Sequence, residues 1–527
     1  MRTRIRLFIS LLASGALLCF VASASRHAQV QQQQPSNKEG ARTSSVTQPA
    51  QGVSDPALLK AINQLIEQSD TAQARWGVFV MSIKDGHVLC SRDGERLFTP
   101  ASNMKIFTTA VALDLLGEGY RWRTSVYAER QVDAGGTLDG DLILYGRGAP
   151  DLDSKRDLKA LANQLYERGL RQVHGNIIGD ASYFRGEAYG VGWQWNDLQW
   201  YYGAEPSALS IDENSIEVTL GPGNKINGPA SVFVNPNDNY VHVTNSATTG
   251  ARDASTTVGI TRELSGDGLH VWGEFPSGGR SFSAFLSVYD PALRAASLFK
   301  QALIARGIHI DGEAHSRDAR TSVADKFSPE KASELGYVES ASLAEIVRKT
   351  NKESNNLFAE LISRTLGKER GALAPDPDER RNRARGDDEA GPAVVKWWLS
   401  SHSIAANALA IHDGSGLSRL DLVSPESATR LLGVAAQSPW SKTFRDSLPN
   451  AGRDGTLSDR LTSLRDRVSA KTGSLTYDHS LSGYLTRDNN EVLVFSIICN
   501  DATGQSHAIR TIDAIVNLLA GRDPAKH

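Results

Sequence analysis

The segment Thr99-Pro100-Ala101-Ser102-Asn103-Met104-Lys105 opens a long apolar run. Threonine is a good helix N-cap and proline is favoured in the first turn, so the pattern predicts a helix that starts at Thr99. Residues three apart share one face of a helix, which brings the Lys105 amine within reach of the Ser102 hydroxyl. Serine becomes a nucleophile only beside a base, and a buried lysine can be that base. Taken alone, the same residues also describe an ordinary helix start, and Ser328-Pro329-Glu330-Lys331 has the same spacing.

Ser354-Asn355-Asn356 precedes a second amphipathic run. One interpretation is a helix cap, because serine and asparagine both cap well. The functional interpretation is a hydroxyl at Ser354 that relays a proton and an amide at Asn356 that holds a peptide group.

Lys471-Thr472-Gly473-Ser474 ends a β-type segment near the C-terminus. Gly473 permits close backbone approach to a ligand. The Lys471 cation and the Thr472 hydroxyl suit a carboxylate. The alternative is an edge strand with an exposed lysine.

The three motifs occur in the order S-x-x-K, S-x-N, K-T-G, each in its expected context of helix start, loop before a helix, and strand. This combination is typical of serine β-lactamases and penicillin-binding proteins. The interval between Ser102 and Ser354 is long enough for a large insertion. With this insertion, the chain resembles the class C low-molecular-mass penicillin-binding proteins, the D-Ala-D-Ala carboxypeptidase/endopeptidase family. The segment Gly148-Ala149-Pro150 departs from the family's usual Gly-Asp-Pro.

The resemblance implies an α/β (α+β) fold with three domains. Residues 55–117 and 336–527 would form the transpeptidase-like catalytic domain, an antiparallel sheet flanked by helices. Residues 118–210 and 286–335 would form an inserted α/β domain. Residues 211–285 would form a small β domain, since short alternating strands with Gly, Asn and Pro punctuation follow one another there. The charged segment Lys368–Glu389 is expected to be a solvated loop.

The resemblance also implies roles for individual residues. Ser102 would be the acylated nucleophile and Lys105 the general base. Ser354 would relay the proton to the leaving amine, and Asn356 would hold the substrate amide and orient Lys105. Lys471, Thr472 and Ser474 would bind the terminal carboxylate of a peptidoglycan stem peptide, and Asp180 would meet its amino end. β-Lactams would act as inhibitors, and no cofactor or metal is implied.

Composition excludes several other classes of protein. The chain has 57 Lys and Arg against 60 Asp and Glu, a net charge of −3, so a basic surface for nucleic acid is not expected. Three cysteines in 527 residues exclude a disulfide scaffold and a cysteine-rich zinc module. We expect Cys90 and Cys499 to be buried, unpaired thiols. A short cluster of His309, Asp311 and His315 is better explained as polar surface than as a metal site.

The N-terminus predicts export from the cytoplasm. Arg2, Arg4 and Arg6 precede an apolar run from Leu7 to Val21 and the small residues Ala22-Ser23-Ala24. Residues 1–24 are therefore predicted to be a cleaved signal peptide, with an uncleaved anchor as the alternative. Residues 25–54, rich in Gln, Ser and Thr, are predicted to be a disordered linker. No stable membrane span is expected after cleavage, and the oligomeric state is not predicted.

Two other functions compete with a DD-peptidase. A β-lactamase would share the three motifs, but its deacylating carboxylate is not found by motif and the long insertion argues against it. A catalytically inactive cell-wall-binding protein is the other alternative, and the intact Ser102, Lys105 and Lys471 argue against it.

Overall fold

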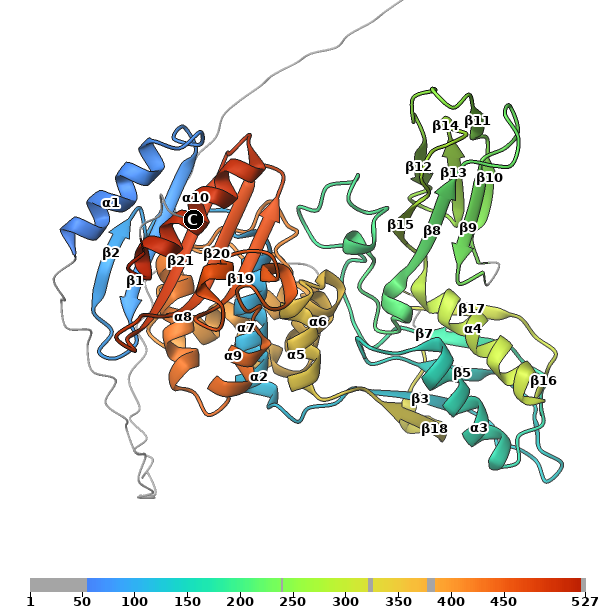
Figure 1. Cartoon of the computed structure of the whole chain (residues 1–527). Coiled ribbons are helices and arrows are strands. Elements are labelled where there is room, and N and C mark those ends of the chain that lie inside the picture. Colours follow the sequence, from blue (N-terminus) through green and yellow to red (C-terminus); the bar gives the residue numbers. More distant parts are fainter. Residues whose placement is uncertain (1–54, 238–239, 321–325, 377–383, 523–527) are drawn as a thin grey trace, which may run out of the picture. The chain divides into compact units, whose positions relative to one another are not determined.

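The computed structural model describes residues 55–237, 240–320, 326–376 and 384–522, and these lie in one compact unit. The N- and C-terminal parts of the chain build an antiparallel sheet together (Figure 1). Its strand order is β19 (Val468–Leu475), β20 (Asp478–Thr486), β21 (Val492–Asn500), β1 (Arg75–Ser82) and β2 (Val88–Arg92). Residues far apart in sequence therefore share one sheet.

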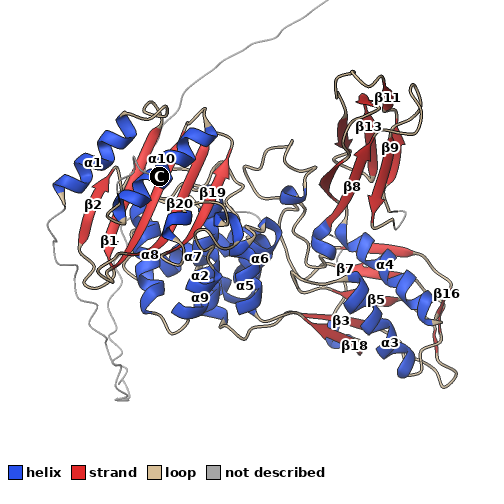
Figure 2. Ribbon diagram, in the orientation of Figure 1, coloured by secondary structure: helices blue, strands red, loops and turns tan. Residues whose placement is uncertain are grey.

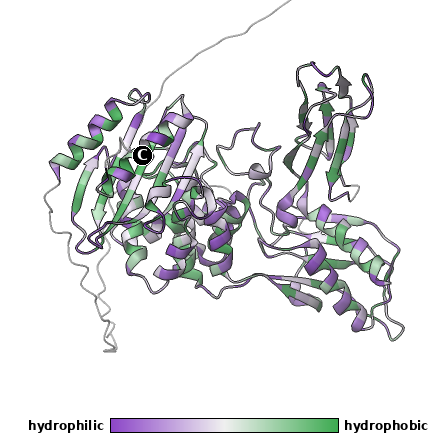
Figure 3. Cartoon of the chain, in the orientation of Figure 1, coloured by the Kyte–Doolittle hydropathy of each residue, from purple (hydrophilic) through white to green (hydrophobic). Residues whose placement is uncertain are grey.

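Helices pack on both faces of this sheet. One face is covered by α1 (Pro56–Glu67) and α10 (Gln505–Leu519), whose Ile62 and Ile515 join a core with Val80 and Phe495. Figure 3 shows α1 with alternating green and purple positions, as expected for a half-buried helix. Asp55 caps α1 through its side chain, which accepts from the backbone N–H groups of Ala57 and Leu58.

The other face carries the helices that flank the first two motifs. Helix α8 packs on β1 and β21, and the remaining helices continue the same apolar core. These helices are α2 (Met104–Leu116), α5 (Leu343–Lys352), α6 (Asn356–Arg370), α7 (Asp387–Ser401), α8 (Pro425–Gln437) and α9 (Ser441–Ser447).

The insertion contains a second five-stranded sheet of mixed direction. Its order is β17 (Ala314–Arg317), β7 (Ile177–Asp180), β5 (Leu142–Tyr145), β3 (Arg123–Ala128) and β18 (Ser333–Glu339). The β17–β7–β5 ladders are parallel and the β5–β3–β18 ladders are antiparallel. Helices α3 (Lys159–Glu167) and α4 (Pro291–Arg306) pack nearby, with a small parallel sheet of β16 (His309–Ile310), β6 (Gln172–Val173) and β4 (Thr137–Leu138).

Short strands dominate residues 215–287, which Figure 2 draws as strands and loops. They form a sheet β15-β8-β9, a sheet β10-β13-β12 and a pair β11-β14 around a core that includes Val218, Leu269 and Leu286. The bounds are β8 (Ser215–Gly221), β9 (Ser231–Asn235), β10 (His242–Asn245), β11 (Thr248–Gly250), β12 (Gly259–Arg262), β13 (Gly268–Trp272), β14 (Glu274–Pro276) and β15 (Phe282–Ser287). The borders of the three expected domains stay a prediction.

The predicted helix start at Thr99 is wrong. The structure has a 3-10 turn over Ala101–Asn103, with Ala101 at φ +49°, and α2 begins at Met104. Thr99 does not cap, because its backbone is bound elsewhere. Its N–H donates to Asn500 Oδ1 (2.9 Å) and its carbonyl accepts from Asn500 Nδ2 (3.1 Å). Tertiary bonds to β21 thus override the local capping preference.

The prediction of a solvated loop at Lys368–Glu389 is also wrong at both ends. Helix α6 continues to Arg370 and α7 begins at Asp387, while residues 377–383 lie outside the described residues. Asp387 Oδ2 accepts from the Arg185 backbone N–H (2.7 Å), and Asp388 Oδ2 accepts from that of Glu187 (3.1 Å). Acids at the start of α7 therefore bind backbone donors of the insertion.

Cys90 and Cys499 are buried and unpaired, as predicted. The predicted signal peptide and linker lie outside the described residues. Within the described ranges, no helix is both long enough and apolar enough to cross a membrane.

Candidate active site

Lys105 is fully buried in the first turn of α2, three residues after Ser102. Its Nζ donates to Ser102 Oγ (2.9 Å), Asn356 Oδ1 (2.6 Å) and the Ser415 carbonyl (2.8 Å). The first two motifs therefore meet at one amine. Ser102 itself is half-buried within the 3-10 turn.

Burial lowers the pKa of Lys105 to about 7, while the charges of Asp413 and Glu360 act to raise it. Both acids organise the loop that presents the Ser415 carbonyl. Asp413 Oδ1 accepts from the Gly416 N–H (2.6 Å), and Glu360 Oε1 accepts from the Ser415 N–H (2.8 Å). Burial, followed by the charge of Asp413, raises the pKa of Glu360 to about 7 as well. An amine with such a pKa is neutral often enough at neutral pH to act as a base.

Sequence reasoning missed Glu360 and the role of Asp413 as charges behind Lys105. Asp413 lies in the segment Asp413-Gly414-Ser415-Gly416, but its effect on Lys105 depends on tertiary placement. Glu360 lies four residues after Asn356 on α6, and this helical spacing was the available signal.

The second motif forms the tight connection between α5 and α6. Ser354 has a left-handed backbone (φ +61°), and its Oγ accepts from Lys471 Nζ (2.9 Å). Asn356 donates through Nδ2 to the Tyr202 carbonyl (2.8 Å), so its Oδ1 faces Lys105. Ser354 thereby joins the second motif to the third.

The third motif lies on β19, at the edge of the sheet. Lys471 is fully buried and its Nζ also donates to the Thr472 carbonyl (2.8 Å). Burial, with a smaller contribution from Lys105, holds the pKa of Lys471 well below its usual value. Thr472 and Thr456 share a hydrogen bond between their hydroxyls (2.6 Å), and Ser474 is exposed.

Gly473 permits a close approach, but to the turn that carries Ser102. A Cβ at this position would lie 2.7 Å from the Pro100 carbonyl oxygen and 3.0 Å from Asn103 Nδ2. The absent side chain thus lets β19 pack directly on the residues that flank Ser102.

Asp180 stands apart from the other predicted site residues. It is fully buried at the end of β7, where Arg317 Nε donates to Oδ2 (2.6 Å) and the Ser182 N–H donates to Oδ1 (2.8 Å). Both carboxylate oxygens are therefore bound within the insertion. The structure brings Ser102, Lys105 and Asn356 into one hydrogen-bonded group. Ser354 and Lys471 form a second group close enough for the two lysines to interact electrostatically, with Thr472 and Ser474 beside Lys471 on β19.

Comparison with known proteins gives a consistent answer. Residues 58–522 match the D-Ala-D-Ala carboxypeptidase 3 (S13) family. The chain is 33% identical over 484 residues to a D-alanyl-D-alanine carboxypeptidase of Actinomadura sp. (strain R39), covering 89% of this chain and 86% of the relative.

Solved structures show the same fold. The crystal structure of penicillin binding protein 4 (dacB) from Haemophilus influenzae is similar with a TM-score of 0.74 and 23% identity, covering 88% of this chain and 99% of that one. A second structure of that protein, complexed with a β-lactam, has a TM-score of 0.69 and 22% identity over 87% and 98% of the two chains. The expected penicillin-binding fold is confirmed. The chain belongs to the D-Ala-D-Ala carboxypeptidase 3 (S13) family of serine-type hydrolases.

Proposed function

We propose that this chain hydrolyses D-Ala-terminated stem peptides of peptidoglycan through an acyl-enzyme on Ser102. The observation that carries the proposal is the buried Lys105 amine, 2.9 Å from Ser102 Oγ and with a pKa of about 7. A serine beside such an amine is an activated nucleophile.

In the proposed reaction, neutral Lys105 takes the Ser102 proton while Oγ attacks the carbonyl of the penultimate D-Ala. The backbone N–H groups of Ser102 and Ser474 stabilise the oxyanion, an interaction worth about 10²–10³ in rate per donor. The C–N bond then breaks, and the leaving amine takes a proton from the Ser354 hydroxyl, which regains one from its hydrogen-bond donor Lys471 Nζ. The proton that Lys105 took from Ser102 passes to Lys471, so that Lys105 is neutral again. Water hydrolyses the ester and frees Ser102.

Substrate binding is assigned to the residues around this cluster. Lys471, Thr472 and Ser474 face the terminal carboxylate, and Asn356 holds the substrate amide and orients Lys105. A contact between Asp180 and the amino end of the stem peptide stays a prediction. The bonds from Arg317 and Ser182 favour a role for Asp180 within the insertion instead.

The same chemistry serves two cleavages, removal of terminal D-Ala and cutting of a D-Ala-to-diaminopimelate cross-link. We propose both as substrates, and β-lactams as acylating inhibitors. The Actinomadura relative is named a D-alanyl-D-alanine carboxypeptidase, and penicillin binding protein 4 has been solved with a β-lactam. A substrate in the cell wall places the protein outside the cytoplasm, as the N-terminal sequence predicts.

Intact-mass spectrometry with benzylpenicillin, followed over time, tests this proposal on wild type and Ser102→Ala. We expect a persistent penicilloyl adduct on the wild type and none on Ser102→Ala. We also expect the wild type, and not Ser102→Ala, to release D-Ala from a stem pentapeptide. Rapid penicillin hydrolysis without a lasting adduct would indicate a β-lactamase. Neither adduct nor hydrolysis would indicate an inactive cell-wall-binding protein.

A further inference from the structure

The insertion holds both asparagines of the Ser354-Asn355-Asn356 motif. Asn356 donates to the Tyr202 carbonyl (2.8 Å), and Asn355 Nδ2 donates to Glu213 Oε2 (2.7 Å). At the same time Asn355 Oδ1 accepts from the Phe358 N–H (3.0 Å) and caps α6. The contacts with the Phe358 N–H and with Glu213 together fix which way the Asn355 amide faces, with its oxygen toward the helix and its nitrogen toward the insertion.

Glu213 reaches this motif from a turn with an uncommon backbone. Asp212, Glu213 and Asn214 all have left-handed φ values of +48°, +54° and +50°. Non-glycine residues in this region are uncommon and persist where surrounding contacts hold them. Here Asp212 Oδ1 accepts from the Ser154 N–H (2.9 Å) and Asn214 Oδ1 accepts from the Ile211 N–H (2.9 Å). The turn is thus built to project Glu213 toward α5 and α6.

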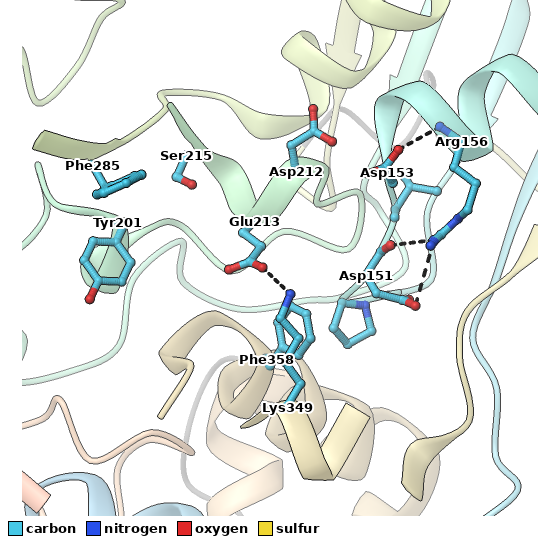
Figure 4. A pocket seen from close by; sticks show the side chains of 12 residues that line it. Asp151, Asp153, Arg156, Tyr201, Asp212, Glu213, Ser215, Phe285, Lys349 and Phe358 are labelled. Atoms are coloured by element: carbon cyan, nitrogen blue, oxygen red, sulfur yellow. Dashed lines mark hydrogen bonds and ion pairs between the residues drawn. The ribbon is translucent and has the colours of Figure 1, made fainter. Parts of the chain in front are cut away.

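The second oxygen of Glu213 is bound by Lys349 of α5. Figure 4 shows this pair pointing across a cavity of about 660 Å³ lined by residues of the insertion and of α5 and α6. Both side chains are more than a third exposed, at 37% for Glu213 and 38% for Lys349. Exposed ion pairs contribute little, so we expect the bond to Asn355 to be the contact that matters for the motif.

We propose that Glu213 is a positioning residue for the reaction, acting through Asn355 on the turn that carries Ser354 and Asn356. This inference rests on the proposed function. Ser354 accepts from Lys471, and Asn356 accepts from Lys105. Both bonds depend on one short connection between α5 and α6, in which Ser354 already has a left-handed backbone. When Asn355 loses its acceptor, the turn loses one of the two contacts that fix the Asn355 amide, and Ser354 Oγ and the Asn356 amide shift relative to both lysines.

Three single variants separate the Asn355 bond from the ion pair. Glu213→Ala removes both contacts. Glu213→Gln keeps an oxygen that accepts from Asn355 but loses the charge. Lys349→Ala removes the ion pair alone. Glu217→Ala, on the outer face of the neighbouring β8, is the matched control for loss of a carboxylate.

The readouts are the second-order rate of acylation by a fluorescent penicillin, kcat and KM for a stem pentapeptide, and Tm. A small displacement away from the reacting atoms can cost up to about 10²-fold in rate. We therefore expect Glu213→Ala to slow acylation by penicillin at least about tenfold. With the stem pentapeptide, we expect the loss to appear mainly in kcat and not in KM. We expect Glu213→Gln, Lys349→Ala and Glu217→Ala to stay within about threefold of wild type, because isolated surface charges contribute little.

A reversed pair keeps the inference testable if Glu213→Ala does not fold. Asn355→Asp retains the capping oxygen and places a second carboxylate against Glu213, so acylation should slow. Adding Glu213→Gln restores a donor–acceptor pair with its direction reversed, so the double variant should recover most of the lost rate.

Acylation of Glu213→Ala at the wild-type rate would overturn the inference. An equal loss of acylation rate in Glu213→Ala, Glu213→Gln and Lys349→Ala would also overturn it. So would an Asn355→Asp defect that the double variant does not relieve. Failure of wild type itself to be acylated would refute the proposed function instead.

Discussion

Replacing Gly473 with alanine tests how closely β19 packs on the nucleophile turn. The new Cβ would lie 2.2 Å from Ser480 Oγ, 2.7 Å from the Pro100 carbonyl oxygen and 3.0 Å from Asn103 Nδ2. The Ser480 hydroxyl cannot rotate away freely, because it donates to that same Pro100 carbonyl (2.7 Å). Since Pro100 and Asn103 flank Ser102, the strand accommodates the methyl group only by moving away from the nucleophile.

The size of this movement follows from the contact distances. Heavy atoms that are not bonded prefer a separation of about 3.5–4.0 Å, so the Pro100 carbonyl must retreat by about 1 Å. A misplacement of about 1 Å in an active site can cost about 10²-fold in rate. Overpacking costs about 1–3 kcal/mol of stability. We therefore expect Gly473→Ala to fold with a lower Tm and to be acylated about a hundredfold more slowly, in line with that displacement.

The assay is the second-order rate of acylation by a fluorescent penicillin, with Tm measured in parallel. Gly119→Ala is the control, since a Cβ at Gly119 meets no atom within 4 Å. Acylation of Gly473→Ala at the wild-type rate, with an unchanged Tm, would show that β19 and the turn are not in the described contact.

Three further predictions concern buried charges. Lys105, with a pKa of about 7, acts as a base only when neutral, so the acylation rate should rise with pH through about 7 and then level off; a flat profile from about pH 5 to 9 would contradict this assignment. Glu360→Gln removes a charge that raises the pKa of Lys105. The midpoint of the same profile should therefore move to lower pH, and an unmoved midpoint would show that Glu360 does not act on Lys105. Arg317→Ala leaves the buried Asp180 carboxylate without its partner and should lower the free energy of unfolding in urea by about 3 kcal/mol. Adding Asp180→Asn should recover part of that loss, whereas an additive loss would argue against the ion pair.

Local sequence was sufficient for the three motifs and for much of the secondary structure. The spacing of Ser102 and Lys105 placed the amine beside the hydroxyl, although the predicted helix start was wrong. The 3-10 turn brings Lys105 Nζ to the same oxygen that a regular helical turn was expected to offer. A short sequence separation leaves few geometries, so the contact was predictable even where the backbone was not.

Local sequence patterns did not predict the contacts between segments that are distant in the chain. Glu213 and Asn355 are separated by strands β8 to β18, and no periodicity in either segment indicates that they meet. Thr99 has the residue type of a cap, yet it is bound to Asn500 of β21. Asp387 appeared to belong to a charged loop, yet it accepts from the Arg185 backbone. In each case a polar group satisfied its hydrogen bonds through the tertiary fold, which local propensity does not contain.

The two buried lysines of the site differ in what surrounds them, and this difference bears on the substrate. Asp413 and Glu360 oppose the effect of burial on Lys105. Lys471 receives no such help: burial and the neighbouring Lys105 both disfavour its charge, and its Nζ donates to the Ser354 hydroxyl and the Thr472 carbonyl. A carboxylate that enters beside Lys471 supplies the missing opposite charge and favours the protonated amine. A peptide with a free terminal carboxylate is therefore expected to raise the pKa of Lys471 on binding, whereas an amidated peptide lacks that opposite charge. The electrostatics of Lys471 thus favour a substrate with a free C-terminus, independently of the sequence motif that first indicated it.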